Sequence, residues 1–265
     1  MFRKIVICLI ILVAIYMLGV EPFWMKKVER SLTVAGLTQA VRVLFLSDLQ
    51  LRGKSGYRER WILKQLATER MDLIVTTGDL FDTAEGMPAA KQFLEQVAHL
   101  APTVAILGNW EHWAKVDLEK YRADLKALGI PLLINEHLNL SIKDQHIFIV
   151  GVDDPSQNLH NLPLALKGVP EDSVTVLLAH GPIIFPVAAA NGIDLMLAGH
   201  THGGQIRIPF MPPFFLPPGC GPYFYGVYKE KQSTLVVTSG VGTSIFPIRF
   251  WCRPEIVFLN LKPGN

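Results

Sequence analysis

The chain is poor in cysteine. Its three cysteines, Cys8, Cys220 and Cys252, are too few for a disulfide scaffold. Because Cys8 lies in an apolar N-terminal stretch, a bridge within the chain would have to join Cys220 and Cys252. We expect buried, reduced thiols instead.

Charge is also scarce, and neither sign dominates. Charged residues make up 18% of the 265 positions, with 25 Lys and Arg, 23 Asp and Glu and a net charge of +2. A dedicated nucleic-acid-binding protein has a strong basic surplus, so we expect no nucleic-acid partner. Hydrophobic residues make up 50% of the chain, which excludes a disordered protein. The sequence has no internal repeat, and no shift in composition after residue 40 marks a second domain.

The longest apolar run lies at the N-terminus. Ile5–Val20 is an unbroken apolar stretch that follows Arg3 and Lys4. As a helix it extends about 24 Å, slightly less than the hydrocarbon core of a bilayer. Phe23–Met25 adds an interfacial aromatic belt. We therefore predict a membrane anchor over residues 1–27.

A cleaved signal peptide and a buried core helix are the alternatives to an anchor. No small-x-small cleavage motif follows the run at the usual distance, which favours the anchor. Lys26, Lys27 and Arg30 follow the run, so basic residues flank it on both sides. The positive-inside rule therefore leaves the orientation open.

Five short apolar runs each end in polar side chains. They are Val41–Leu46, Leu73–Thr76, Thr103–Leu107, Val174–Ala179 and Leu195–Ala198. Such runs are typical of strands buried on both faces. Helix-like segments at 58–70, 88–100 and 116–128 alternate with the first strands and predict an α/β layered fold. Runs at 146–150, 235–238 and 255–261 predict a second sheet. We assign residues 28–40 to a connector or first strand, and residues 41–265 to one domain.

Six polar side chains follow these runs: Asp48, Asp79, Asn109, His180, His200 and His202. In open α/β sheets, ligands bind beyond the carboxyl ends of the strands, so we expect the six to meet at one edge. Their oxygen and nitrogen atoms suit divalent cations, and two cations that share a bridging carboxylate would use all of them. Such a pair keeps a net positive charge for a phosphoryl oxygen and lowers the pKa of a bound water.

Each motif alone has an ordinary structural explanation. Gly78-Asp79 and Gly108-Asn109 are common in turns, and a lone histidine is usually a core or surface residue. The paired histidines within Gly199–Gly204 are more specific, because glycine permits close backbone approach to an anion. The ordered set therefore favours a metal site over a chance arrangement.

With these motifs in this order, and with Gln205 after the last one, the chain resembles the calcineurin-like metallophosphoesterase superfamily, most closely its membrane-associated bacterial branch. The resemblance covers about residues 41–262 and includes Arg253–Ile256. It implies a four-layer αββα sandwich behind the anchor helix and a hydrolase with two divalent cations. By motif, the first cation is held by Asp48, Gln50, Asp79 and His202, and the second by Asp79, Asn109, His180 and His200, with Asp79 bridging.

Two positions depart from the family pattern. Gln50 stands where the family has histidine, and an amide oxygen is a weaker ligand that prefers harder cations. We therefore expect Mn²⁺ first, with Mg²⁺, Fe or Zn²⁺ as alternatives. Trp110 stands where the family has a histidine that, beside Asn109, helps to stabilise the transition state and protonates the leaving group. Either His112 swings in to supply the imidazole, or it is a surface residue and the cations act alone. Asn109 and His112 are thus the candidate catalytic residues.

A segment rich in proline and aromatic residues, 207–226, follows the last histidine motif and therefore lies beside the site. Its prolines exclude a helix or a central strand. It forms either a lipid-contacting surface or an irregular cover over the second sheet, and the apparent anchor favours lipid contact.

These features predict a membrane-associated hydrolase of a phosphodiester or pyrophosphate in a lipid-linked or nucleotide-lipid substrate. The resemblance offers one specific candidate, UDP-2,3-diacylglucosamine in lipid A synthesis, which related enzymes hydrolyse at the cytoplasmic face. We accordingly expect the bacterial inner membrane, with the domain on the cytoplasmic side. A membrane-tethered nucleotide or protein phosphatase and a catalytically weakened scaffold are the alternatives. The sequence leaves the oligomeric state open.

Overall fold

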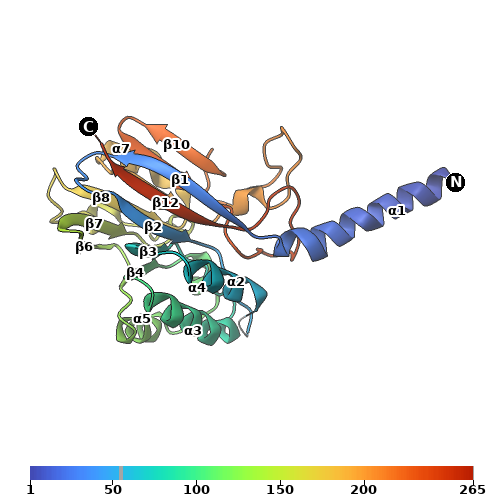
Figure 1. Cartoon of the computed structure of the whole chain (residues 1–265), viewed down its shortest axis with the longest axis horizontal. Coiled ribbons are helices and arrows are strands. Elements are labelled where there is room, and N and C mark those ends of the chain that lie inside the picture. Colours follow the sequence, from blue (N-terminus) through green and yellow to red (C-terminus); the bar gives the residue numbers. More distant parts are fainter. Residues whose placement is uncertain (54–55, 265) are drawn as a thin grey trace.

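The computed structural model describes residues 1–53 and 56–264 and arranges them around two six-stranded sheets (Figure 1). The first sheet contains, in spatial order, β1 (Lys26–Val34), β12 (Glu255–Pro263), β2 (Val41–Leu46), β3 (Leu73–Thr76), β4 (Thr103–Ile106) and β5 (Leu132–Leu133). The second contains β10 (Gly226–Glu230), β11 (Ser233–Val237), β9 (Leu195–Ala198), β8 (Val174–Ala179), β7 (Gln145–Gly151) and β6 (Glu136–Ile142).

Parallel pairing brings the predicted motifs together. In the first sheet β2, β3, β4 and β5 are parallel neighbours, and in the second β7, β8, β9 and β11 are. Parallel strands end at the same edge of a sheet, so the segments after β2, β3, β4, β8 and β9 emerge on one side of the sandwich.

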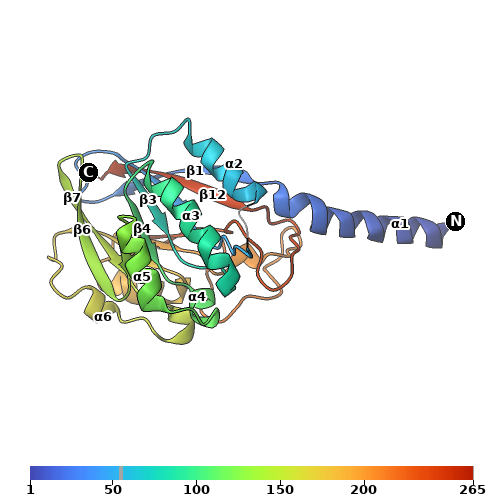
Figure 2. The ribbon, with the colours of Figure 1, turned by 90° about the horizontal axis from the view of Figure 1, so that it is seen from below.

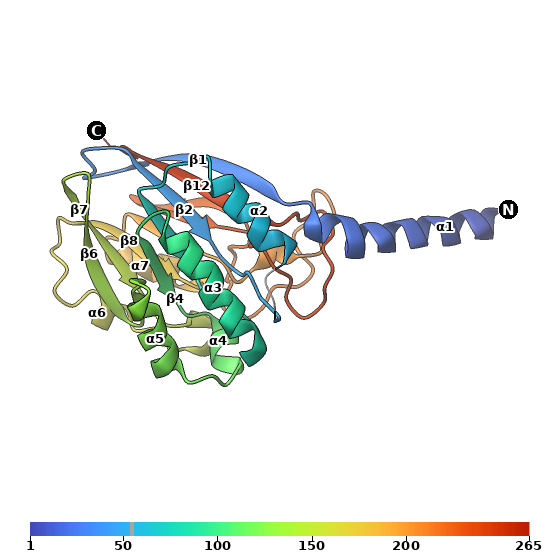
Figure 3. The same ribbon diagram turned by 60° about the horizontal axis from the view of Figure 1, so that its bottom comes forward.

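Three hydrophobic clusters fill the spaces between four layers. Val43 and Phe45 of β2 pack between the sheets against residues of β7, β8 and β9, whereas Leu44 and Leu46 point to the outer face. Helices α2 (Tyr57–Leu66), α3 (Met87–Ala98), α4 (Asn109–Trp113) and α5 (Leu118–Ala127) cover that outer face (Figures 2 and 3). Helices α6 (Leu162–Ala165) and α7 (Phe185–Ala190) cover the second sheet. The architecture is the predicted αββα sandwich.

The predicted strands buried on both faces are confirmed, and four of them, β2, β3, β8 and β9, have the predicted bounds. The segment assigned to a connector or first strand is largely β1, which pairs in parallel with β12 over its whole length. It therefore belongs to the sheet and is not a free linker. All three cysteines are free, and Cys220 and Cys252 are buried, as expected.

The N-terminal helix projects from the sandwich (Figures 1 and 2). α1 (Phe2–Ile15) continues through a π-helical turn, η1 (Tyr16–Val20), and a 3-10 turn, η2 (Glu21–Phe23). The 22 residues Phe2–Phe23 are long and apolar enough to cross a membrane, by length and composition. The side chains of α1 are exposed to solvent, so the core-helix alternative is wrong.

Candidate metal centre

Left-handed backbone conformations mark the candidate ligands. Five of them have φ between 48° and 67°: Asp48, Gln50, Asp79, His200 and His202. This region is unfavourable for residues other than glycine and costs about 1 kcal/mol or more at each position. Strain of this kind is retained when the surrounding structure fixes the backbone, and it concentrates at functional sites.

Backbone hydrogen bonds fix these loops to one another. The Asp48 N–H donates to the Gly78 carbonyl at 3.1 Å, and the Gln50 N–H donates to the Asp79 carbonyl at 2.9 Å. The Gly242 N–H donates to the Asp48 carbonyl from the other side. The segments after β2 and β3 therefore hold their ligands at a constant separation.

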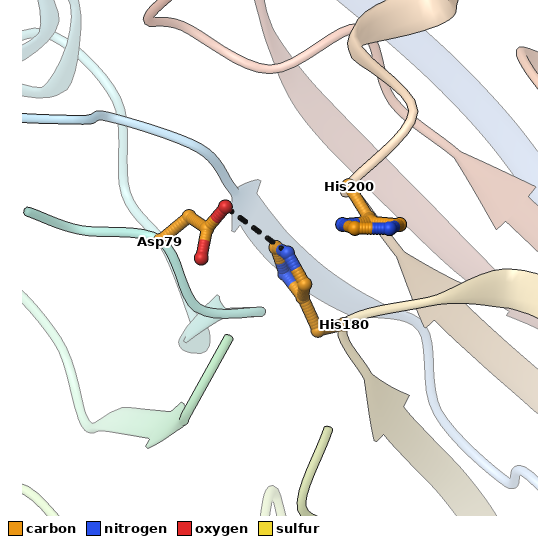
Figure 4. Close-up of side chains that lie close together, drawn as sticks. All are labelled: Asp79, His180 and His200. Atoms are coloured by element: carbon orange, nitrogen blue, oxygen red, sulfur yellow. Dashed lines mark ion pairs between the residues drawn. The ribbon is translucent and has the colours of Figure 1, made fainter. Parts of the chain in front are cut away.

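Ligand atoms of Asp79, His180 and His200 all lie within 4.8 Å of one another (Figure 4). His180 Nε2 lies 3.1 Å from Asp79 Oδ2 and 3.1 Å from Asn109 Oδ1. These four residues are the predicted set for the second cation, and the structure brings them together.

Hydrogen bonds on the far side of each imidazole orient the two histidines. His180 Nδ1 lies 2.6 Å from the Thr77 carbonyl, and His200 Nε2 lies 2.7 Å from the Pro218 carbonyl. An N–H that donates to a carbonyl fixes the tautomer, so His180 Nε2 and His200 Nδ1 are free to bind a cation. Burial lowers the pKa of His200, which favours the neutral form that a ligand needs.

Asp48, Gln50 and His202 form the other half of the site. His202 Nε2 lies 3.3 Å from Gln50 Nε2 and 3.5 Å from Asp48 Oδ1. Burial lowers the pKa of His202 to about 3, so its imidazole is neutral. Gln50 Oε1 and His202 Nδ1 are buried and have no hydrogen-bond partner among the described residues. An unpartnered buried polar atom is costly, and a bound cation would satisfy an amide oxygen or an imidazole nitrogen placed here. The donor set therefore fits a divalent cation.

The two carboxylates give the site its negative charge. Asp48 and Asp79 are buried at 0% and 1% exposure. Burial disfavours a charged imidazole, yet Asp79 raises the pKa of His180 to about 10. The carboxylates thus attract positive charge at this point, and divalent cations would supply it.

Glycines let the loops approach the ligands closely. A Cβ on Gly108 would lie 2.3 Å from Asp79 Oδ1, and a Cβ on Gly199 would lie 2.4 Å from Asp48 Oδ2. Both distances are far below a normal contact. Any larger residue at either glycine would push the carboxylate of a candidate ligand out of place.

Glu111 is a structural residue of the site that the sequence analysis did not single out. Its fully buried carboxylate accepts hydrogen bonds from the backbone N–H groups of Asp79 and Gly108, both at 2.9 Å, and of Leu80 at 2.7 Å. Burial and the nearby Asp79 charge raise the pKa of Glu111 to about 7. Glu111 joins the loops after β3 and β4. The available signal was its place two positions after the candidate ligand Asn109.

A cavity of about 200 Å³ lies over the ligands. Asp79, Asn109, His200 and His202 contribute to its floor. Its walls come from the two tryptophans of α4, from the turn after β7 and from two loops: Trp110, Trp113, Ser156, Gln157, Phe215, Pro217, Pro218, Ser244 and Ile245. The walls are largely apolar.

His112 is not among the described residues that line this cavity. Its Nε2 lies 2.7 Å from Asp153 Oδ1, which holds the ring to one side. Trp110 lines the cavity instead, with its ring edge-on to Trp113 at 5.2 Å. The structure therefore brings the seven predicted ligands together but does not bring His112 to them. This arrangement favours the alternative in which the cations act without that imidazole.

Comparison with known proteins agrees with this geometry. A family model described as "Calcineurin-like phosphoesterase" matches residues 41–204. Phosphodiesterase YaeI of Escherichia coli K12 is 31% identical over 93% of this chain and 92% of its own length. A Bos taurus relative named "Transmembrane protein with metallophosphoesterase domain" is 32% identical over 84% of this chain, which spans 53% of that protein.

Two solved structures share the fold. The protein TT1561 of Thermus thermophilus superposes with a TM-score of 0.53 at 12% identity, covering 76% of this chain and 90% of that one. Phosphopantetheinyl hydrolase from Mycobacterium tuberculosis gives 0.50 at 10% identity, covering 80% of this chain and 96% of that one. The family model spans both halves of the sandwich, and YaeI aligns over nearly the whole chain. The protein is thus a metal-dependent phosphoester hydrolase that belongs to the calcineurin-like phosphoesterase family.

Proposed function

We propose that this protein is a membrane-anchored phosphodiesterase or pyrophosphatase that takes a lipid-linked substrate. The observation that carries the proposal is the position of exposed apolar side chains around the metal cavity. We call this set the apolar rim: Ile208, Phe210, Phe214, Phe215, Ile245 and Phe246. Phe215 and Ile245 also line the cavity itself, so the rim continues into the site.

Hydrogen bonds join the two loops that carry the rim. Gln205 Nε2 donates to the Ser244 and Phe246 carbonyls, both at 3.1 Å, and the Arg207 N–H donates to the Phe250 carbonyl at 2.9 Å. The loops therefore present one surface. Exposed apolar patches of this kind mark membrane or ligand contacts.

The anchor emerges beside these loops (Figure 1). The Arg249 N–H donates to the Met17 carbonyl at 3.1 Å, and buried Glu21 accepts the backbone N–H groups of Trp251 and Cys252. Cleavage of a signal peptide after the apolar run would remove the first of these contacts and leave a buried carboxylate near a new chain end. The contacts thus support a retained anchor and a site that faces the bilayer.

Two divalent cations, when bound, supply a nucleophilic hydroxide and charge stabilisation for the phosphoryl oxygens. The chain supplies position and shape. Asp154 accepts hydrogen bonds from the backbone and hydroxyl of Ser156 and from Gln157 Nε2, which aims the turn after β7 into the cavity. The Asn109 amide and the second N–H of Gln157 Nε2 can orient the substrate phosphate. Trp110 and Trp113 give the cavity an apolar wall.

Trp110 cannot donate a proton to a leaving group. The site therefore suits a substrate whose leaving group departs without a general acid, such as the phosphate of a pyrophosphate. UDP-2,3-diacylglucosamine combines that leaving group with acyl chains for the apolar rim. It is the specific candidate substrate, with Mn²⁺ as the preferred ion and the cytoplasmic side of a bacterial inner membrane as the location.

The test compares two substrates with the full-length, Mn²⁺-loaded protein: soluble bis(p-nitrophenyl) phosphate and UDP-2,3-diacylglucosamine in vesicles. Phe214→Ser, at a rim position that does not line the cavity, should lower kcat/KM about tenfold for the lipid substrate, because a phenyl group buried against an acyl chain is worth about 1.5 kcal/mol or more. It should change hydrolysis of the soluble diester less than about twofold. Leu164→Ser, an exposed apolar position on α6, is the matched control.

Equal losses on both substrates would contradict a lipid-binding rim. Rapid turnover of a soluble nucleotide or a phosphopeptide, with none of the lipid substrate, would favour the tethered phosphatase. Absence of metal binding and of hydrolysis would leave the scaffold alternative.

A further inference from the structure

A second cavity, of about 430 Å³, lies where the N-terminal helix meets the sandwich. It shares no lining residue with the cavity over the metal ligands. Its walls come from the end of the helix, the start of β1 and three loops: Tyr16, Glu21, Trp24, Lys26, Arg207, Tyr225, Ser239, Trp251, Cys252 and Arg253. Cationic and aromatic side chains predominate in this set.

Arg207 is the least engaged cation of the cavity. Its guanidinium lies 5.5 Å from the centre of the Tyr225 ring, and it forms no ion pair with any residue in 1–53 or 56–264. Lys26 Nζ lies 3.0 Å from Tyr225 Oη and 2.9 Å from Glu255 Oε2, so its charge is matched by one carboxylate.

Arg253 contributes a third positive charge. It donates hydrogen bonds to the Trp24 carbonyl at 2.7 Å and the Met25 carbonyl at 2.9 Å, and its guanidinium lies 4.1 Å from the Trp24 ring centre. Backbone carbonyls and an indole ring orient this cation without neutralising it. Nitrogen atoms of the guanidinium remain for an anion.

Glu21 is the one carboxylate among the described residues that line the cavity, and the buried Glu255 lies beside Lys26. Glu21 is fully buried and accepts the backbone N–H groups of Trp251 and Cys252. With Lys26, Arg207 and Arg253 facing Glu21 and Glu255, three positive charges meet two negative ones. The cavity therefore has room and a surplus of positive charge for one anionic group.

With Phe2–Phe23 inserted in a bilayer, the cavity would lie where this segment leaves the hydrocarbon. Phe23 and Trp24 at the end of the helix are 47% and 53% exposed, and Trp251 on the adjoining loop is 56% exposed. Tryptophan at such a position is typical of the headgroup layer. Above them, the apolar side chains of α1 are exposed along its whole length.

We propose that this cavity binds the phosphate of an anionic phospholipid, whose acyl chains lie along α1. Arg207 and Arg253 offer planar guanidinium donors that match a phosphate. Lys26 has three N–H donors, of which two are used by Tyr225 and Glu255, so one remains for the phosphate. Continuity with the apolar helix identifies a lipid as the occupant, since a free anion would have no use for the exposed helix surface. The site is independent of the hydrolytic activity, and it rests on insertion of α1 in a bilayer.

The test uses the full-length protein in phosphatidylcholine nanodiscs with or without about 20% phosphatidylglycerol, an anionic fraction that resembles a charged leaflet. Native mass spectrometry after release counts the lipids retained on the chain. Wild type should retain one phosphatidylglycerol molecule per chain, and Arg207→Gln should lower that retention about fivefold or more. Lys229→Gln removes an exposed charge on β10 and is the matched control, which should retain the lipid as wild type does.

Arg207→Lys separates charge from geometry, because it should retain an intermediate amount of lipid. An unfolding temperature within about 2 °C of wild type checks that each variant is folded. Equal retention by wild type and Arg207→Gln would overturn the proposal, as would equal retention of phosphatidylcholine. Retention of added inorganic phosphate without any phosphatidylglycerol would overturn the lipid as occupant. None of these measurements depends on whether the metal site is active.

Discussion

The floor and the rim of the metal cavity are built on opposite principles. The floor consists of buried polar side chains on short loops that hydrogen bonds join together, with Asp48, Asp79 and His180 at no more than 1% exposure. The rim consists of apolar side chains on long loops, and Phe210, Phe214 and Phe215 are more than 60% exposed. The floor is fixed by the ends of the strands and sets the chemistry. The rim lies on loops, and in the proposed function it selects which molecules reach the floor.

Asp79→Asn should give the largest effect, because it removes the charge of the predicted bridging ligand from the centre of the floor. The amide keeps the Oδ1 acceptor for the Trp110 N–H, which lies 2.9 Å away, so the loop should persist. We expect kcat/KM for a chromogenic diester to fall by about 10³-fold or more, together with loss of bound Mn²⁺. Steady-state kinetics and elemental analysis test this. Activity within tenfold of wild type would show that Asp79 is not a bridging ligand.

Glu111→Gln probes what holds the floor in place. A carboxylate can accept all three backbone N–H groups, whereas the amide nitrogen of glutamine faces at least one of them as a second donor. We expect a loss of about 2–3 kcal/mol in the free energy of unfolding and a melting temperature lower by about 5–8 °C. Glu95→Gln, on an exposed face of α3, is the control. If both variants melt alike, Glu111 does not hold the loops.

Gln50→His should strengthen cation binding at the floor of the cavity, since an imidazole nitrogen is a better ligand than an amide oxygen. We expect the affinity for the more weakly bound of the two cations to rise about tenfold. We also expect the preferred cation to change from Mn²⁺ towards Zn²⁺. Titration of activity and of bound metal with each ion measures both changes. Gln96→His on the surface of α3 controls for adventitious binding. Weaker binding by Gln50→His would mean that the loop is shaped for the amide.

His112 gives a smaller effect, and one that depends on pH. Its hydrogen bond to Asp153 raises the pKa of His112 above the usual 6.5, although burial opposes this. The resulting stability is fully present below about pH 6.5 and disappears as pH rises through the raised pKa. His112→Gln should therefore lower the free energy of unfolding by about 0.5–1 kcal/mol at about pH 5.5 and by less at about pH 9.

Kinetics of the same position test its chemistry. His112→Ala should lower the rate equally for esters with good and poor leaving groups, because the ring lies outside the cavity. A selective loss on poor leaving groups would identify His112 as the general acid. The active site would then include His112 and its partner Asp153, which lies 41 positions later in the sequence.

Phe210→Ser at the rim should have the smallest effect. The side chain is fully exposed. We expect a change in the free energy of unfolding below about 0.5 kcal/mol and no more than about a twofold change on a soluble diester. Denaturant unfolding and kinetics measure both quantities. A large loss of stability would show that Phe210 packs in the core. The rim would then not be the exposed surface that distinguishes it from the buried floor.

Sequence alone predicts the parts of this molecule in which burial determines residue type. β2, β3, β8 and β9 are buried on both faces almost throughout, so they appear as runs of mainly aliphatic and β-branched residues, with Arg42 as the one charged exception. β6 and β1 have one face exposed, and the polar residues on that face make both strands hard to recognise from the sequence.

The candidate ligands were predicted because their types and order follow the strand ends. Their left-handed backbone could not be read from Asp, Gln and His. Nor does any pattern reveal that Glu111 accepts three backbone N–H groups, or that Asp153 turns His112 aside. Both facts depend on which segments become neighbours after folding.

The helix runs without interruption into η2 and is held there by Glu21, Met17 and Arg249. Inserted in a bilayer, such a junction would act as a rigid stalk and not as a flexible linker. The height of the catalytic pocket over the lipid headgroups is then set by the tilt of the stalk, and the tilt responds to bilayer thickness. A change in membrane thickness would therefore change the height of the pocket relative to the phosphates it must reach. Molecules in bulk solution would have limited access to a pocket that faces the bilayer.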